Sequence, residues 1–127
     1  MKILHTHHSV SNVILLISKY LTENNIKIFA VFNHGKEASQ TDMSLPETQV
    51  IVFGDPKVGT FLMQENNAIA LELPLKVAIW KQDTQTTLGY KVPSLLIDEF
   101  TITEHKVILE KMDNFMSNLV AVVLDTE

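Results

Sequence analysis

The chain has 127 residues, a formal net charge of −5 and no cysteine, and this length suits one domain that buries a core without disulfide staples. All ten basic residues are lysines. Because nucleic-acid recognition depends on basic patches and on the arginine fork, the composition argues against a nucleic-acid partner. The missing cysteines exclude disulfides and thiolate chemistry, so we expect a cytoplasmic protein.

The first predicted elements are a strand and an amphipathic helix. Residues 2–7 favour a strand, and His5 interrupts the apolar start too early for a signal peptide. No apolar run approaches the ~20 residues of a membrane helix, so we expect no membrane partner. Ser9 is a typical N-cap for a helix that ends at Asn24-Asn25. The apolar positions of this helix recur at steps of three and four residues: Val10, Val13, Ile14, Ile17, Tyr20 and Leu21.

A second strand is predicted over residues 26–32, which are rich in branched and aromatic side chains. This strand stops at Asn33-His34-Gly35, where turn-forming residues follow it. The polar segment 36–44 reads as a long loop, and a short helix through residues 37–39 is the alternative.

The third predicted strand, residues 50–53, runs through Gly54 into a helix over residues 56–66, with Asp55 as the N-cap. Backbone N–H groups and the positive end of the helix dipole meet at this turn. The turn therefore predicts an anion site, to which Lys57 adds a charge. The alternative is an ordinary helix cap, because the Asp55 carboxylate competes with an incoming anion.

Gly54 and Gly59 have the spacing of a phosphate-binding loop, G-x-x-x-x-G-K-[ST]. Thr60 and Phe61 stand where that motif requires Lys and Ser/Thr. Without the lysine that reaches the terminal phosphates and the hydroxyl that holds magnesium, nucleoside triphosphate hydrolysis is not indicated.

Further along the chain, residues 75–80 and 87–92 predict a hairpin across residues 83–86, and Pro93 begins a short helix. Helices and strands alternate, and at least one strand pair is a hairpin. We therefore expect an α+β, two-layer fold in which helices pack on a mixed β-sheet. Nothing in the pattern indicates a linker or a repeat, so we expect one domain over residues 1–127.

A long helix ends the chain. A capping-box pattern, Thr101-x-x-Glu104, precedes it. Its apolar end, residues 119–124, is expected to pack into the core or against a second subunit. The predicted core face of this helix consists of Ile108, Met112, Phe115, Met116, Leu119 and Val123.

Several motifs occur together in the middle of the chain. They are Asn33-His34, Leu45-Pro46, residues 53–60, Leu62-Met63-Gln64 and residues 73–77. Together they resemble the bacterial and archaeal family called domain of unknown function 302, and the core of the resemblance spans residues 30–93. The resemblance implies a small α+β domain with an unassigned biochemical role. Because members of that family are often dimers, it also implies a homodimer.

The chain departs from the family pattern at four places. Asp55 replaces a usual Asn, and Asn33 replaces an Asp before the histidine. Tyr90-Lys91-Val92-Pro93 replaces a tyrosine-containing strand that leads to Asn-Asp-Pro, and Asp98-Glu99-Phe100 stand where the family often has a second histidine. If a site needed both histidines, this chain is altered at that site.

His34 is the candidate catalytic residue, because it lies at a predicted strand end and histidine acts as a base or a ligand near neutral pH. Its candidate partners are Asp55, Lys57, Thr60 and Glu47, provided that the second and third strands are neighbours. The candidate ligand-binding set is His34, Gly54, Asp55, Lys57, Gly59 and Thr60. The alternative is that His34 bonds a backbone carbonyl at the strand end.

His5 and His7 point to one face if residues 2–7 form a strand, so they are weak candidates for a metal site. No third ligand is visible locally, and a surface or packing role is the alternative. Haem ligation through a histidine is a further variant, although no attachment motif is present. The sequence identifies no cofactor.

We interpret the chain as an uncharacterised homodimeric domain that binds a small molecule, with an anion as the favoured class, or that has an accessory role. One alternative is an enzyme of unknown reaction that uses His34 as general base. A structural or interaction module without a ligand is another, and metal or haem binding through the histidines is the last.

Overall fold

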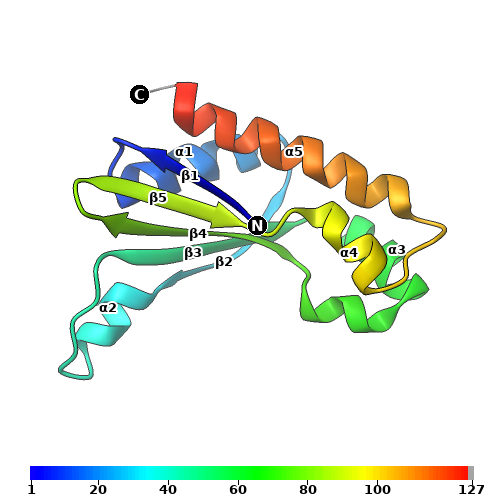
Figure 1. Ribbon diagram of the computed structural model, residues 1–127, viewed down its shortest axis with the longest axis horizontal. Helices are drawn as coiled ribbons and strands as arrows, with labels where there is room; N and C mark the ends of the chain where they lie inside the picture. Colours follow the sequence, from blue (N-terminus) through cyan, green and yellow to red (C-terminus); the bar gives the residue numbers. More distant parts are fainter. Residues whose placement is uncertain (126–127) are drawn as a thin grey trace.

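A five-stranded sheet organises the fold, and the computed structural model describes residues 1–125 (Figure 1). The strands are β1 (Lys2–Thr6), β2 (Lys27–Asn33), β3 (Thr48–Gly54), β4 (Leu75–Gln82) and β5 (Gln85–Tyr90). The α-helices are α1 (Val10–Glu23), α2 (His34–Ser39), α3 (Pro56–Glu65), α4 (Leu96–Glu99) and α5 (Lys106–Asp125). Two 3₁₀ turns, η1 (Asn67–Leu71) and η2 (Pro93–Leu95), complete the described elements.

The strands follow the order β1-β5-β4-β3-β2, and every neighbouring pair is antiparallel. The predicted α+β fold with helices packed on a sheet is confirmed. The sheet, however, is antiparallel throughout rather than mixed. The physical reason is that β1 and β2 point the same way but form the two opposite edges. The crossover through α1 therefore spans the whole sheet instead of joining two parallel neighbours.

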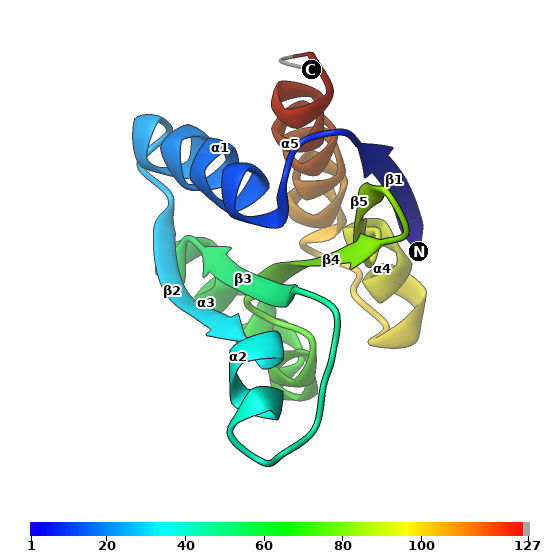
Figure 2. The ribbon, with the colours of Figure 1, turned by 90° about the vertical axis from the view of Figure 1, so that its left-hand side faces the viewer.

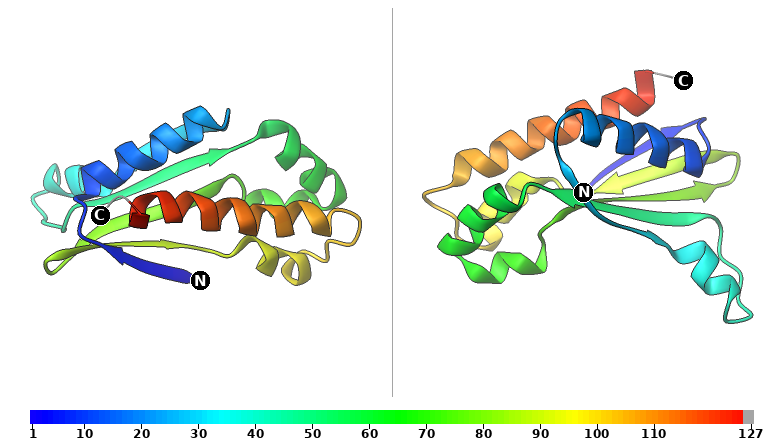
Figure 3. Two further views of the ribbon diagram at one scale, coloured as in Figure 1. Left: turned by 90° about the horizontal axis from the view of Figure 1, so that it is seen from above. Right: turned by 180° about the vertical axis from the view of Figure 1, so that it is seen from behind.

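Helices α1 and α5 lie over the same face of the sheet (Figures 2 and 3). Every third or fourth residue of each helix meets every second residue of the strands, which is the packing that the two periodicities predict. The apolar C-terminal run therefore packs into the core, one of the two expectations for it. The buried core consists of Val10, Val13, Ile17, Leu21, Ile51, Phe53, Val77, Ile79, Leu88, Tyr90, Met116, Leu119, Val120 and Val123.

The first helices begin at side-chain caps. Ser9 Oγ accepts a hydrogen bond of 3.1 Å from the Asn12 N–H, so the predicted N-cap of α1 is confirmed. The polar segment after β2 is helical over its first part, since Asn33 Oδ1 accepts from the Lys36 N–H at 3.0 Å and starts α2. The short helix named as the alternative to a long loop is therefore present, and it begins earlier than residue 37.

The opposite face of the sheet is covered neither by α1 nor by α5, and α2 projects beyond the strand ends on that side (Figure 1). The register places apolar residues of β1, β2, β3 and β4 on this face, and Gly89 of β5 lies between Ile3 and Ala78. Ile3 is 44% exposed and Phe32 is 47% exposed. We call this surface the open-face band and define it by Ile3, Phe32, Val50, Ala78 and Trp80.

Candidate functional site

A cavity of about 530 Å³ opens at the end of the sheet where β3 ends and β4 begins. Its walls come from β2, from the turn between β3 and α3, from the first turns of α3 and from α5. Among the described residues, the charged side chains on the wall are Asp55 and Lys111. The apolar lining consists of Ile26, Phe29, Phe53, Pro56, Val58, Met63, Leu73, Pro74, Leu75, Ile108, Met112 and Phe115. Such a wall suits a small apolar molecule with few polar groups.

The turn between β3 and α3 forms as the sequence predicts. Asp55 Oδ1 accepts a hydrogen bond of 2.9 Å from the Lys57 N–H, and Pro56 is the first helical residue. The Gly59 N–H donates to the Asp55 carbonyl at 3.0 Å. Because a carboxylate already occupies this helix start, the turn contributes an apolar wall more than a cradle for an anion.

The predicted ligand-binding residues divide into two groups. Gly54, Asp55 and Gly59 line the cavity, whereas Lys57 and Thr60 do not. The Thr60 hydroxyl turns back and donates to the Pro56 carbonyl at 2.7 Å. The turn is therefore placed at a cavity, but only part of the predicted set faces it.

His34 lies at the other end of the sheet. Strands β2 and β3 are neighbours, but their antiparallel register pairs Gly54 with Lys27 and Gln49 with Asn33. His34 follows Asn33, so the length of β2, roughly 20 Å at 3.4 Å per residue, separates it from Gly54. The expected approach of His34 to the Gly54–Thr60 turn is therefore not formed.

The surroundings of His34 are local. Its Nδ1 lies 3.8 Å from Glu37 Oε2, and its ring stacks on Phe32 with centroids 6.3 Å apart. Its side chain is 49% exposed. Of the four candidate partners, Asp55, Lys57 and Thr60 lie near the far end of the strand, whereas Glu47 precedes β3 at the end of the sheet where His34 lies.

The N-terminal histidines are not aligned along one strand. β1 ends at Thr6, so His7 lies beyond it and the same-face argument does not apply. His5 Nδ1 lies 3.0 Å from Thr87 Oγ1. Over residues 1–125, no group of three or more His, Asp and Glu side chains is arranged to hold a metal ion.

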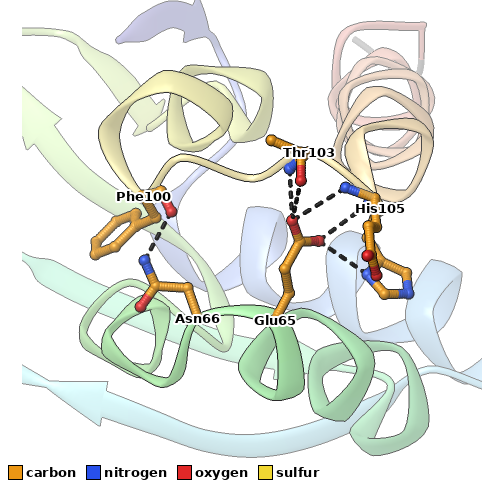
Figure 4. Close-up of polar contacts among 6 residues, drawn as sticks. Glu65, Asn66, Phe100, Thr103 and His105 are labelled. Atoms are coloured by element: carbon orange, nitrogen blue, oxygen red, sulfur yellow. Dashed lines mark hydrogen bonds and ion pairs between the residues drawn. The ribbon is translucent and has the colours of Figure 1, made fainter.

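The strongest polar cluster joins the end of α3 to the start of α5 (Figure 4). One oxygen of the Glu65 carboxylate accepts hydrogen bonds from the Thr103 N–H, from the Thr103 hydroxyl at 3.1 Å and from the Glu104 N–H at 3.0 Å. The other accepts from the N–H and from the ring Nδ1 of His105, at 3.1 and 2.9 Å. We call these contacts the Glu65 clamp.

The Glu65 clamp favours the ionised carboxylate. The Thr103 N–H contributes most to lowering the pKa of the Glu65 carboxyl from 4.5 to about 2, although burial opposes the shift. The Glu104 N–H, the His105 ring and the Thr103 hydroxyl lower this pKa further. An ionised carboxylate only accepts hydrogen bonds, so the His105 Nδ1 carries the proton between them.

The Glu65 clamp replaces the predicted capping box. Helix α5 begins at Lys106, and Thr101 before it has a left-handed φ of 50°. The N–H groups of Glu104 and His105 donate to the Glu65 carboxylate rather than to the Glu104 carboxylate. Glu65 is far in sequence from its partners, so no local sequence pattern predicts the clamp. The one signal for it in the sequence is that Glu65 is an acid in the last turn of a predicted helix, where the helix dipole disfavours negative charge.

An antiparallel sheet with helices on one face and an apolar cavity at the strand ends defines a small α+β domain with a ligand-sized pocket. The family model described as domain of unknown function DUF302 matches residues 2–119, and the chain belongs to that family. The match extends well beyond the segment whose motifs resemble the family.

A solved structure shares this fold. The crystal structure of an uncharacterised conserved DUF302 protein from Bacillus stearothermophilus superposes with a TM-score of 0.80, covering 96% of this chain and 94% of the other at 14% sequence identity. At that identity the likeness concerns the fold alone.

Two similar proteins are much longer than the matched segment. The chain is 33% identical over 76 residues to the fluoride-specific ion channel FluC 1 of Brucella suis and to FluC 2 of Brucella melitensis. The match covers 60% of this chain but only 30% and 28% of those proteins. Within residues 1–125, none of the helices combines the length and the apolar character needed to cross a bilayer.

The Glu65 clamp predicts a pH-dependent stability. The pKa of Glu65 is lower in the folded protein than in the unfolded chain, so unfolding takes up a proton as the pH falls. We expect the free energy of unfolding contributed by Glu65 to be complete above about pH 4.5 and to decline between pH 4.5 and 2. Glu65→Gln lowers the free energy of unfolding at pH 7 and flattens its decline in acid, and urea unfolding across the pH range measures both.

Glu104→Gln is the matched control, because the adjacent Glu104 contributes its N–H to the clamp and not its carboxylate. This variant keeps the wild-type slope. A Glu65→Gln protein whose stability parallels wild type from pH 5 to pH 2 contradicts the role of the clamp.

Proposed function

We propose that this chain binds a small, mainly apolar molecule in the cavity between α3 and α5. The observation that carries the proposal is the cavity itself, whose volume of about 530 Å³ and apolar wall are those of small-molecule pockets. Residues 53–56 and 73–75, which belong to the motifs that mark the family, contribute to the wall. The family motif thus coincides with the pocket.

The apolar wall supplies the driving force for binding. Burial of apolar surface contributes about 25 cal/mol per Å², so a ligand that buries ~200 Å² gains about 5 kcal/mol before the entropic cost of association. Phe53 and Phe115, with ring centroids 6.5 Å apart, form the aromatic part of the wall. Met63 and Met112 add flexible thioethers that adapt to ligands of different shape.

We also propose that the domain is a homodimer, joined through the open-face band. An exposed apolar strip across a sheet that no described helix covers is typical of a protein–protein interface. A second copy presents the same strip and matches it in a two-fold arrangement. The cysteine-free composition supports a cytoplasmic location for this dimer.

The Brucella relatives favour a second candidate, an accessory role beside a membrane protein. Each carries a segment similar to this chain within a much longer protein called a fluoride-specific ion channel. The cavity does not suit fluoride itself, because a small, strongly hydrated anion needs many hydrogen-bond donors and this wall is mainly apolar. In this role the domain acts through protein contacts rather than by holding the ion.

Gly59 offers a direct test of the pocket. Its added Cβ lies 3.7 Å from Met63 Cε, an ordinary contact, so Gly59→Ala leaves the cavity open and stabilises α3 by about 0.5–1 kcal/mol. Gly59→Leu fills the cavity. With N-phenyl-1-naphthylamine, a neutral dye that fluoresces in apolar surroundings, we expect saturable binding to wild type and Gly59→Ala and about tenfold weaker binding to Gly59→Leu.

Thr60→Leu is the control, since the neighbouring residue does not line the cavity and leaves dye binding unchanged. Circular dichroism verifies that each variant folds. The proposal fails if wild type gives no saturable signal, or if a folded Gly59→Leu protein binds the dye as wild type does.

The dimer is tested by sedimentation equilibrium. Phe32→Glu places a charge in the open-face band and is expected to shift the protein to monomer. Leu71→Glu changes a residue that is 81% exposed in η1, outside the band, and keeps the dimer. A monomeric wild-type protein, or a Phe32→Glu variant that still dimerises, contradicts this interface.

Fluoride binding is tested by titration with sodium fluoride against sodium chloride at equal ionic strength, followed through amide NMR shifts. We expect no saturable, fluoride-specific shift at Gly54, Gly59 or Lys111, because the wall offers too few donors to replace the hydration shell. A saturable shift at these amides with sodium fluoride but not with sodium chloride means that the domain binds the ion. That result contradicts an accessory role that acts through protein contacts.

A further inference from the structure

Two charged side chains, Asp55 and Lys111, interrupt the apolar wall of the cavity, and they differ in their surroundings. Asp55 already accepts the Lys57 N–H at 2.9 Å and caps α3. The Lys111 ammonium group makes no hydrogen bond or ion pair with any residue in the range 1–125. Of the two, Lys111 is the group whose side chain supplies hydrogen-bond donors and a positive charge to an acceptor on a ligand.

Lys111 belongs to the cavity face of α5. Ile108, Met112 and Phe115 lie three residues before it, one after it and four after it, and all three line the cavity. Lys111 lines the cavity and is itself exposed, so its aliphatic stem contributes to the apolar wall while its ammonium group stays in contact with solvent. A ligand whose apolar body fills the cavity therefore presents its outer end to this ammonium group.

A second cation lies at the same end of the molecule. The Lys27 ammonium group stands 5.0 Å above the centre of the Phe29 ring, and Phe29 lines the cavity. The cation–π contact holds this positive charge beside the wall. Two lysines thus favour a ligand whose polar end is anionic.

Asp55 limits how much negative charge the ligand carries. Its carboxylate lies on the same wall, so each further negative charge on the ligand meets repulsion from it. A phosphate monoester carries up to two negative charges near pH 7, whereas a carboxylate carries one. The wall therefore favours a monoanion over a dianion.

From these contacts we infer that the cavity binds a monocarboxylate with an apolar body, and that Lys111 pairs with the carboxylate. This inference rests on the proposed function, since it names the ligand class of the same cavity. It adds a charge preference that the apolar wall alone does not imply, because an apolar pocket by itself prefers the neutral analogue of any ligand.

The test compares decanoate with 1-decanol, which has the same chain and no charge, as competitors that displace N-phenyl-1-naphthylamine at pH 7.5. The variants are Lys111→Met, which keeps the stem and removes the charge, and Lys19→Met, which removes an exposed charge of α1. We expect Lys111→Met to weaken decanoate binding about fivefold, which is the size of a solvent-exposed ion pair. Binding of 1-decanol stays unchanged. Lys19→Met changes neither, and decyl phosphate binds wild type more weakly than decanoate.

The outcomes separate the two proposals. If the dye and 1-decanol bind but Lys111→Met leaves decanoate unchanged, or weakens both ligands equally, the carboxylate preference is wrong and the apolar pocket stands. Tighter binding of decyl phosphate than of decanoate overturns the preference for a monoanion. If wild type binds neither the dye nor 1-decanol, the proposed pocket itself fails and this inference fails with it.

Discussion

The Glu65 carboxylate joins the last turn of α3 to the first turn of α5, and the cavity depends on that junction. Val58, Gly59 and Met63 of α3 form one side of the cavity, while Ile108 and Met112 of α5 form another. Helices are stiff on this scale, so fixing their adjoining ends fixes the distance between these walls. The carboxylate also accepts hydrogen bonds from the N–H groups of Thr103, Glu104 and His105, the residues that lead into α5.

The cavity marks the boundary between two apolar clusters. The larger joins α1 and α5 to the sheet, and the smaller, which includes Leu62, Ile69 and Leu109, lies around α3, α4 and the beginning of α5. Phe53 belongs to the first cluster, whereas Met112 packs against the second, and both reach the cavity wall. The cavity is therefore lined from both clusters, and the Glu65 clamp joins α3 to the residues before α5.

Local sequence patterns predict most of the helices and strands, whereas the order and register of the strands depend on long-range pairing. The cap at Ser9, the turn at Gly54 and the hairpin after Leu75 follow from residue spacing and turn chemistry, and the structure shows each of them. Strand order leaves no such trace. His34 approaches the Gly54 turn only if the second and third strands are neighbours; they are, but the antiparallel register carries His34 to the opposite end.

Long-range contacts also explain why the sequence alone did not identify Lys111 and Glu65 as important residues. Lys111 reads as an ordinary solvated lysine on a helix, and only the fold shows that its neighbours at 108, 112 and 115 face a cavity. Glu65 reads as a surface acid at a helix end, yet its partners lie about forty residues later, a separation without a local signature. By contrast, the resemblance of residues 53–60 to a known family located one wall of the cavity correctly, because that wall is contiguous in sequence.

The cavity lies at the Gly54 end of β3, whereas the open-face band crosses this strand at Val50, which makes the two proposed activities compatible. Side chains alternate along a strand, so Phe53 contributes to the cavity and the helix-covered core, while Val50 contributes to the open-face band. Lys111 belongs to α5, which covers the other face of the sheet, so a second copy docked on the band, as proposed, would meet the sheet from the side opposite Lys111.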